Sequence, residues 1–181
     1  FDAAGYYCQH WLLDAQNMGV PQRRERVFFV CLRKDLIDYV PQTYNLFDVL
    51  PRLILDFNEP GISCEEAGLT LGDPITTPCY SEEYDRLKRG LPKKYLQCAL
   101  VQKTDIHPTL IAGYRTKASP MPDWGKQWLS VSDICKVSSF PQDYDFGTQK
   151  PEYICGMSVP PIMIAQIATQ VYEQWLTKLT K

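Results

Sequence analysis

The 181-residue sequence has few of the groups on which acid–base or metal chemistry relies. It holds two histidines, His10 and His107, and neither lies beside a nucleophile in a known pattern. It contains no Gly-x-Ser-x-Gly, Walker or His-Glu-x-x-His motif. Its seven cysteines form no Cys-x-x-Cys pair, so no metal site is predicted. These absences exclude the common hydrolase, nucleotide-binding and zinc-site patterns.

Long apolar runs, targeting segments and excess charge are also missing. No uninterrupted apolar run approaches the roughly 18 residues of a membrane span, and no signal peptide is evident, so we expect a cytoplasmic protein with no membrane partner. A net charge of -2 and a pI near 5.7 argue against a protein that coats nucleic acid nonspecifically. Hydrophobic residues make up 45% and charged residues 22%, which is typical of a folded domain. The chain begins at Phe1 without a methionine, which we interpret as a portion of a longer protein.

Basic side chains are concentrated in islands. Residues 48–85 carry nine acidic side chains and one basic one, Arg52. By contrast, residues 23–34 hold four arginines and a lysine against a single glutamate, and bases recur from Arg86 to Lys103 without an acid. Arginine is well shaped to bind phosphates or base edges, although a solvated basic face would give the same pattern.

Hydrophobic patterning predicts few regular elements. Residues 6–13 and 27–32 are expected to form two strands on either side of a turn, and residues 108–114 a brief strand. Serine caps and charge order predict short helices over 81–90 and 130–137. A final helix should open at 158–161, with one apolar face made of Ile164, Ile167, Ala168, Val171, Tyr172, Trp175, Leu176 and Leu179.

The turn between the first two strands carries the densest chemistry. Arg24 and Arg26 are two residues apart, so in an extended chain they point the same way, and Glu25 points opposite. Two parallel guanidinium groups would suit one anionic or carbonyl-rich ligand. A solvated hairpin is the alternative interpretation.

Three segments resemble the motifs of one enzyme family. Residues 17–28 are similar to the Gly-Val-Pro-Gln-x-Arg-x-Arg motif of cytosine-C5 DNA methyltransferases. Residues 129–144, with Phe140-Pro141, resemble the family's penultimate motif, and residues 154–161 resemble its last motif. The three occur in the family's order, with a variable segment where the family keeps its target-recognition domain.

The resemblance implies roles for the arginine motif. Arg26 matches the arginine that binds the edge of the flipped cytosine, and Arg24 its partner near the target phosphates. Gln22 matches the glutamine that helps to shape the catalytic pocket. A base must leave the helical stack before its C5 atom can be attacked, and a pocket must then bind its polar edge.

The resemblance also implies a cofactor, S-adenosylmethionine, and double-stranded DNA as a partner. Ser158 and Val159 match residues that line the cofactor pocket, and Met157 stands where the family usually has asparagine. Thr109 matches the threonine of the recognition domain that lies beside the extruded nucleotide. The neighbouring basic loops are expected to contact bases, because their side chains suit guanine; they contain Lys103, Arg115 and Lys117.

Several family features have no match. The glycine-rich cofactor loop, the Pro-Cys nucleophile and the Glu-Asn-Val glutamate are missing, and Pro78-Cys79 lies in the variable segment. Gln127 and Ser132-Asp133 replace the usual arginine and Arg-Glu pair, which puts the internal ion pairing of the penultimate motif in doubt.

Together these features predict an α/β protein: the C-terminal part of a Rossmann-like methyltransferase domain with an inserted, mostly irregular or β recognition domain. Residues 1–45 would end the catalytic domain, 46–150 form the recognition domain, and 151–181 return to the catalytic domain as a helix. The N-terminal catalytic portion, in the same chain or a separate subunit, is the expected partner, and this chain alone should be inactive. The alternative is a non-catalytic DNA-binding specificity subunit, or a remnant, of a split methyltransferase.

Overall fold

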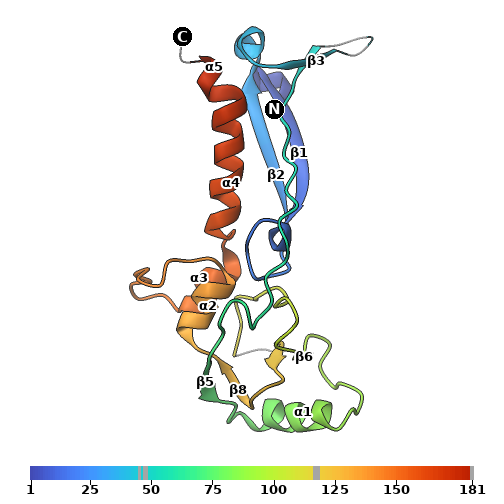
Figure 1. The fold of residues 1–181 in the computed structure, drawn as a ribbon, viewed down its shortest axis with the longest axis vertical. Helices are drawn as coiled ribbons and strands as arrows, with labels where there is room; N and C mark the ends of the chain where they lie inside the picture. Colours follow the sequence, from blue (N-terminus) through green and yellow to red (C-terminus); the bar gives the residue numbers. More distant parts are fainter. Residues whose placement is uncertain (45, 47–48, 116–118, 180–181) are drawn as a thin grey trace.

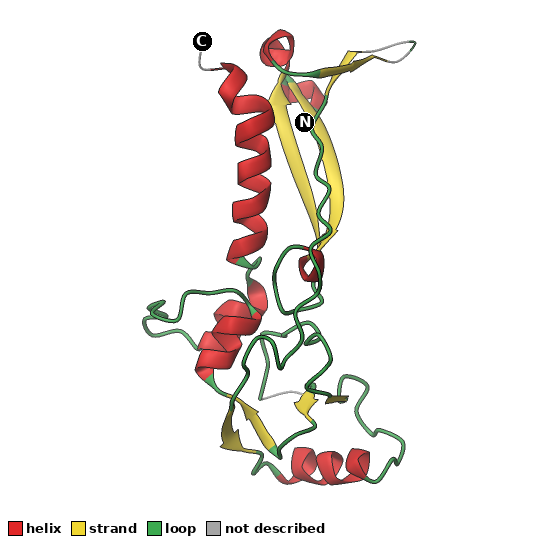
Figure 2. Ribbon diagram, in the orientation of Figure 1, coloured by secondary structure: helices red, strands yellow, loops and turns green. Residues whose placement is uncertain are grey.

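The structure, a computed structural model, describes residues 1–44, 46, 49–115 and 119–179. The ribbon is elongated, with a hairpin beside a long helix in its upper half and shorter elements below (Figure 1). Helices, strands and long loops all occur, so the chain is mixed α/β as predicted (Figure 2). The helices and strands are β1 (Tyr6–Asp14), β2 (Glu25–Arg33), β3 (Gln42–Tyr44), β4 (Val49–Pro51), β5 (Leu71–Pro74), α1 (Pro78–Lys88), β6 (Leu100–Val101), β7 (Met121–Pro122), β8 (Gln127–Leu129), α2 (Val131–Val137), α3 (Pro151–Met157), α4 (Pro161–Val171) and α5 (Thr177–Leu179).

The upper half, which we call the hairpin lobe, is built on the antiparallel pair β1–β2. Alternate side chains of the two strands point to opposite faces of the hairpin. One face packs in a core with α4 and with the extended segment that contains Leu53 and Leu55. Leu12, Val27 and Phe29 lie on the other face and are 63%, 53% and 61% exposed. The hairpin therefore has one covered and one bare apolar face.

The strand register places Cys8 directly opposite Cys31 on the bare face. Gly5 and Lys34, just beyond the ladder, are linked by a Lys34 N to Gly5 O bond of 2.9 Å. Hydrogen-bonded and non-hydrogen-bonded pairs alternate, so Cys8 and Cys31 form a non-hydrogen-bonded pair with Cα atoms about 4.5 Å apart. That separation suits a disulfide.

We therefore expect glutathione disulfide to join Cys8 and Cys31 in the isolated chain. Two thiols would give one disulfide, and the oxidant would leave as two glutathione molecules. Peptide mapping by mass spectrometry should find the linked β1 and β2 peptides, whereas the buried Cys64 and Cys98 should stay free. Recovery of Cys8 and Cys31 only as separate glutathione adducts would contradict the register.

The final helix buries one row of side chains spaced four residues apart. Met163, Ile167 and Trp175 are 0%, 7% and 2% exposed, and Val171 and Leu179 pack beside them. A spacing of four drifts around a helix of 3.6 residues per turn. A π-helical turn over Tyr172–Leu176 takes up part of this drift, because it holds more residues per turn. The row therefore stays on the hairpin.

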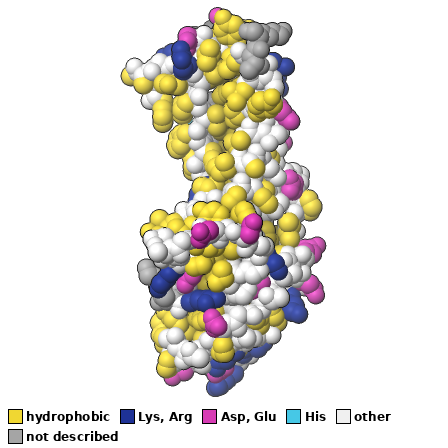
Figure 3. Space-filling model, turned by 90° about the vertical axis from the view of Figure 1, so that its left-hand side faces the viewer, with side chains coloured by type: hydrophobic (Ala, Val, Ile, Leu, Met, Phe, Trp, Pro, Cys, Tyr) yellow, Lys and Arg dark blue, Asp and Glu magenta, His cyan; other side chains and the backbone are white. Residues whose placement is uncertain are grey.

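A neighbouring row on the same helix is exposed. Ile164, Tyr172 and Leu176 are 48%, 58% and 45% exposed, and Ala168 lies between them. The apolar face predicted for this helix is therefore only partly covered within this chain, because the hairpin covers one row. The face that carries α4 shows hydrophobic side chains gathered over its upper part (Figure 3).

Within the described residues, one helical stretch, Pro151–Leu179, is long and apolar enough to cross a membrane, by length and composition only. The sequence has no uninterrupted apolar run of this length, because the stretch joins α3 and α4 across the junction at Ser158–Pro160. Glu152 and Glu173 also fall within it. The core helix of a soluble protein can have the same length and apolar composition.

The lower half, which we call the distal lobe, has its own core of buried side chains from 75 to 155. Its sheets are short two-stranded pairs, β5–β8 and β6–β7. The helix predicted over 81–90 is present as α1 and begins earlier, at Pro78, because proline is favoured in a first helical turn. The helix predicted over 130–137 is present as α2, and Ser130 caps it as expected.

The brief strand predicted over 108–114 was wrong. This segment is irregular and ends in a turn, and its neighbour His107 makes only an isolated bridge to Gln22. Its backbone groups bond to buried side chains instead of to an adjacent strand, as the site geometry below explains.

Candidate functional site

The loop between β1 and β2 is closed by the Asp14 carboxylate. This group accepts hydrogen bonds from the backbone N–H groups of Gln16 at 3.2 Å and Arg24 at 2.9 Å. Gly19 adopts a φ of +69°, and a Cβ at this position would lie 2.6 Å from the Glu59 Oε2 atom. The left-handed backbone favours glycine here, whereas the Glu59 carboxylate lies at the end of a flexible side chain that could move aside. The two bonds to Asp14 therefore hold the loop in one shape.

Gln22 lies at the end of this loop and is completely buried. Its Nε2 atom donates to the Val137 carbonyl at 3.1 Å, and its Oε1 atom accepts from the Leu110 N–H at 3.3 Å and from Arg24 at 3.3 Å. One amide thus connects the end of α2, the segment after Thr109 and the arginine motif. The described contacts engage both its donor and its acceptor atoms.

Arg24 is 1% exposed and is held by carbonyl groups. Its Nη1 atom donates to the Leu110 carbonyl at 2.9 Å, and Nη2 donates to the carbonyls of Gly156 and Ser158 at 2.7 Å each. Burial lowers the pKa of Arg24 to about 10, with a smaller effect from the charge of Arg26. The group remains protonated at neutral pH.

Arg26 lies close enough to Arg24 for its charge to lower the pKa of Arg24. It is half-buried, and its Nη1 atom donates to the Glu25 carbonyl at 2.7 Å. Because Arg24 is committed to interior carbonyls, the structure leaves Arg26 as the member of the pair nearer solvent.

Thr109 is exposed beside the arginine motif. Its Oγ1 atom donates to the Arg23 carbonyl at 2.7 Å, and the Arg23 N–H donates to the His107 carbonyl at 2.9 Å. Two chain segments more than eighty residues apart in sequence are thereby fixed side by side. The arginine motif and the Thr109 segment, which the sequence related only through their resemblance to one family, are therefore adjacent in space.

His107 supports this contact from the interior and is 1% exposed. One ring nitrogen, Nδ1, lies 2.6 Å from the Pro108 carbonyl, while Nε2 has no partner among the described residues. Burial lowers the pKa of His107 to about 4, which favours the neutral ring. Sequence reasoning gave this residue no role, and no motif would have found it.

We expect His107 to make the folded chain sensitive to acid. Its folded pKa lies below its unfolded value of 6.5, so the unfolded state binds more protons between these values and the free energy of unfolding falls as pH drops from about 6.5 to 4. A pKa difference between 6.5 and about 4 corresponds to a loss of about 3 kcal/mol in the free energy of unfolding at low pH. Urea unfolding of His107→Gln at pH 7 and pH 4.5 should show a smaller difference than the wild type.

His10 offers the matched control, because it is the other histidine and lies exposed on β1. His10→Gln should keep the acid sensitivity of the wild type. An equal loss of that sensitivity in both variants would contradict the assignment to His107.

The three residues expected to face the cofactor lie between α3 and α4. Met157 is 63% exposed, and Val159 is half-buried against the hairpin-lobe core. Ser158 donates from Oγ to the Ile154 carbonyl at 2.7 Å, and its own carbonyl accepts from Arg24. Its polar groups are thus engaged within the protein. The segment can offer an apolar wall to S-adenosylmethionine, and the polar contacts would have to come from elsewhere.

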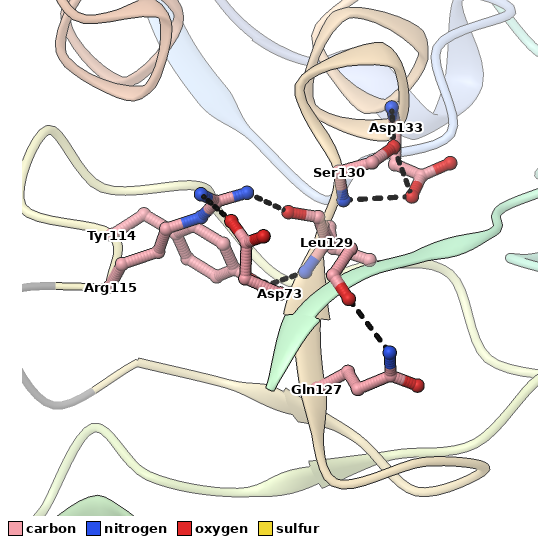
Figure 4. Close-up of polar contacts among 8 residues, drawn as sticks. Asp73, Tyr114, Arg115, Gln127, Leu129, Ser130 and Asp133 are labelled. Atoms are coloured by element: carbon pink, nitrogen blue, oxygen red, sulfur yellow. Dashed lines mark hydrogen bonds and ion pairs between the residues drawn. The ribbon is translucent and has the colours of Figure 1, made fainter. Parts of the chain in front are cut away.

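The expected base-contacting residues are not equivalent. Lys103 is exposed, and Lys117 lies outside the described residues. Arg115 forms an ion pair with Asp73 at 3.1 Å and donates to the Leu129 carbonyl (Figure 4). Arg115 therefore serves the distal lobe itself and would have to leave two partners to reach a base.

The penultimate motif, where ion pairing was in doubt, is held by hydrogen bonds from backbone N–H and hydroxyl donors to the Asp133 carboxylate. The buried Asp133 carboxylate accepts from the Ser130 N–H at 2.9 Å (Figure 4). It also accepts from the Thr70 N–H at 2.8 Å. Gln127 donates to the Gly72 carbonyl at 2.7 Å. These bonds fix the start of α2 and, through Val137 at its end, the position of Gln22.

Solved structures with a similar fold are methyltransferases. The matches include a methyltransferase encoded within a prophage of E. coli (15% identity, TM-score 0.61, 95% of this chain and 62% of that one). A Spodoptera frugiperda DNMT2 mutant matches at 16% identity and a TM-score of 0.59, over 94% of this chain and 59% of that one. The chain thus has the fold of part of a methyltransferase.

Residues 1–173 match the model of the C-5 cytosine-specific DNA methylase family, and the chain belongs to that family. The Type II methyltransferase M.BspRI of Lysinibacillus sphaericus is 29% identical over 81% of this chain and 36% of that protein. M.BsuRI of Bacillus subtilis is 26% identical over 94% of this chain and 43% of that protein. The chain therefore spans less than half the length of these two relatives.

Proposed function

We propose that this chain is the C-terminal, DNA-recognition part of a DNA (cytosine-5-)-methyltransferase. The assembled enzyme transfers a methyl group from S-adenosylmethionine to C5 of a cytosine flipped out of double-stranded DNA. This chain supplies DNA recognition, contacts to the cytosine edge and one wall of the cofactor site. Without the catalytic portion it is inactive.

The observation that carries this proposal is that the arginine motif, the segment after Thr109 and the last motif meet around Gln22 and Arg24. These residues bond to Leu110, which follows the recognition threonine, and to Gly156 and Ser158 of the last motif. The sequence resemblance assigns the three segments to one active-site region, and they meet at one point in the fold. A chance set of motifs would not be expected to converge.

The two cores suggest domain limits slightly different from those read in the sequence. The proposed catalytic part includes residues 1–59 and 159–181, because Leu53 and Leu55 pack with the hairpin. The proposed recognition domain covers about 60–158, because Cys155 in α3 packs with the distal core. The sequence boundaries at 45 and 150 lie about 14 and about 8 residues earlier along the chain, respectively.

The catalytic portion of the enzyme is the proposed partner for the hairpin lobe. The bare face of β1–β2 and the exposed row on α4 are large apolar surfaces, and such surfaces mark sites of interaction. Strands of α/β sheets are normally covered on both faces by helices. We assign both surfaces to that portion, which carries the Pro-Cys nucleophile, the Glu-Asn-Val glutamate and the glycine-rich cofactor loop.

Each site residue receives a role in this proposal. Arg26 binds the polar edge of the flipped cytosine, and Thr109 holds the backbone beside it. Lys103 and Lys117 contact DNA from the recognition domain, where lysine supplies charge to phosphates or a donor to guanine. Arg115 forms an ion pair with Asp73, so we assign it mainly to stabilising the recognition domain.

Met157, Ser158 and Val159 form the cofactor wall. When bound, S-adenosylmethionine supplies the methyl group as an electrophile. This chain's part is to pack an apolar surface against the cofactor and to exclude water from one side. Gln22 shapes the catalytic pocket from the protein interior, since both polar atoms of its side chain form hydrogen bonds within the protein.

The biological setting is proposed from the named relatives. Both are Type II methyltransferases of bacteria, and such names belong to restriction-modification systems. We therefore place this chain in the cytoplasm of a bacterium or of a phage host, where free thiols are kept reduced.

The test combines this chain with a polypeptide that carries the missing motifs, encoded upstream of Phe1 or in a separate gene. The two should co-purify, and the complex should transfer a labelled methyl group to cytosine in duplex DNA. Neither polypeptide should do so alone. Tight binding of S-adenosylmethionine by this chain alone would contradict a missing main cofactor site.

The competing function is a DNA-binding specificity subunit without catalysis, or a decayed remnant. This function is favoured if no polypeptide that carries Pro-Cys and Glu-Asn-Val restores methyl transfer with this chain, while this chain still binds duplex DNA. A chain that binds neither DNA nor a catalytic portion would contradict both functions.

A further inference from the structure

Arg24 is placed where it cannot serve as a phosphate contact without unfolding its surroundings. Its two terminal nitrogens donate to Leu110, Gly156 and Ser158, and the side chain is buried. Its sequence neighbour Arg23 is exposed and uses its backbone N–H and carbonyl to hold the segment around Thr109. The two adjacent arginines therefore point to different environments.

The acceptors of Arg24 belong to two segments that touch. Leu110 lies in the irregular segment after Thr109, and Gly156 and Ser158 lie at the end of α3. A Cβ at Gly156 would collide with the backbone of Ile111 and Ala112. The backbones of the two segments are therefore in direct contact, and Arg24 closes the contact from inside.

Carbonyl oxygens that meet in the interior need hydrogen-bond donors, because a buried acceptor without a partner costs free energy. A guanidinium has five donors in a rigid plane and can bridge several acceptors at once, whereas an ammonium acts as a point charge. Arg24 spans its three carbonyls with bonds of 2.7–2.9 Å. Its charge also strengthens these bonds in the interior.

We infer that Arg24 is a positioning residue that sets Thr109 for the target nucleotide and ties its segment to the wall around Ser158. It does not touch DNA. This inference rests on the proposed function, because it assigns Thr109 to the DNA side. It replaces the role near the target phosphates that the sequence resemblance implied for Arg24.

The test measures binding of mixed-sequence duplex DNA fragments by this chain as a function of salt. Arg24→Lys keeps the charge and loses the planar fork, so we expect about tenfold weaker binding with an unchanged salt dependence. A lost phosphate contact would instead lower the slope of log K against log salt by about 0.9. Arg33→Lys, in a surface ion pair with Asp35 at the other end of β2, is the matched control and should bind as the wild type does.

A double-mutant cycle with Thr109→Val separates positioning from a general loss of stability. If Arg24 acts through Thr109, Arg24→Lys should cost less than about twofold in the Thr109→Val background, because coupled residues are not additive. Additive losses would overturn the inference. So would a reduced salt slope in Arg24→Lys.

Hydrogen exchange on the unmutated chain keeps the inference testable if Arg24→Lys does not fold. Amides of residues 110–112 and 157–158 should exchange as one unit and gain protection together when DNA is added. Protection of 110–112 without change at 157–158 would overturn the link. If the wild-type chain binds no DNA, the proposed function and the DNA role of Thr109 fail together. If the amides of residues 110–112 and 157–158 exchange at unrelated rates, the link made by Arg24 is refuted whether or not DNA binds.

Discussion

Replacing Arg26 with alanine is expected to lower methyl transfer by the assembled enzyme about 100- to 1,000-fold, the cost of removing one preorganised donor from a developing charge. Arg26 is half-buried beside Arg24 and is the member of the pair that remains near solvent. Its guanidinium can donate two parallel bonds to a carbonyl-bearing base edge. The measurement is the single-turnover rate of labelled methyl transfer by this chain combined with the catalytic portion.

Two further variants make the result specific. Arg26→Lys should recover only part of the rate, because an ammonium cannot make two parallel bonds. Arg33→Ala should leave the rate near that of the wild type, since Arg33 is a surface residue paired with Asp35 at the far end of β2. Methyl transfer that survives Arg26→Ala unchanged would remove Arg26 from the active site.

Features encoded by local patterns were predicted well from the sequence. The aromatic and apolar composition of residues 6–13 and the continuous apolar run at 27–32 predicted β1 and β2, and Ser130 predicted the start of α2. Both signals depend on residues a few positions apart, which propensity and capping rules describe. The family motifs added the order of the segments but no contacts between them.

The role of Arg24 depended on long-range contacts and could not be read from sequence. The spacing of Arg24 and Arg26 predicted a shared side, but not that one would be buried by carbonyls more than eighty residues away. The strand expected over 108–114 failed for the same reason. Its Leu110 N–H and C=O are bonded by Gln22 and Arg24, which removes the need for a neighbouring strand.

The final helix shows a different limit. A helical wheel places Ile164 and Trp175 on one apolar face, yet Trp175 is buried and Ile164 is exposed. The π-helical turn over Tyr172–Leu176 and the width of the hairpin decide which row is covered here. A pattern of hydrophobic residues indicates that a face will be buried, but it does not identify the surface that buries it.

Replacing Trp175 with alanine is expected to lower the free energy of unfolding of this chain by about 3–5 kcal/mol. Trp175 is 2% exposed, and its Nε1–H donates to the Arg52 carbonyl at 2.9 Å. The change would leave a cavity between the helix and the hairpin-lobe core, and the partly buried Arg52 carbonyl would lose its donor. Because whole domains are stabilised by only about 5–15 kcal/mol, urea unfolding should detect the loss easily.

Tyr172→Ala is the matched aromatic change on the neighbouring row of the same helix, and its effects should be the reverse. Tyr172 is 58% exposed, so the free energy of unfolding of the isolated chain should change by no more than about 0.5 kcal/mol. In the complex its ring would be covered by the catalytic portion, and loss of a buried aromatic anchor costs about 2 kcal/mol, or roughly 30-fold in affinity. Titration of the catalytic portion into each variant measures this difference. Unchanged affinity for Tyr172→Ala would show that the exposed row is not the surface by which the two portions meet, and the partner would then have to cover the bare face of β1–β2 alone.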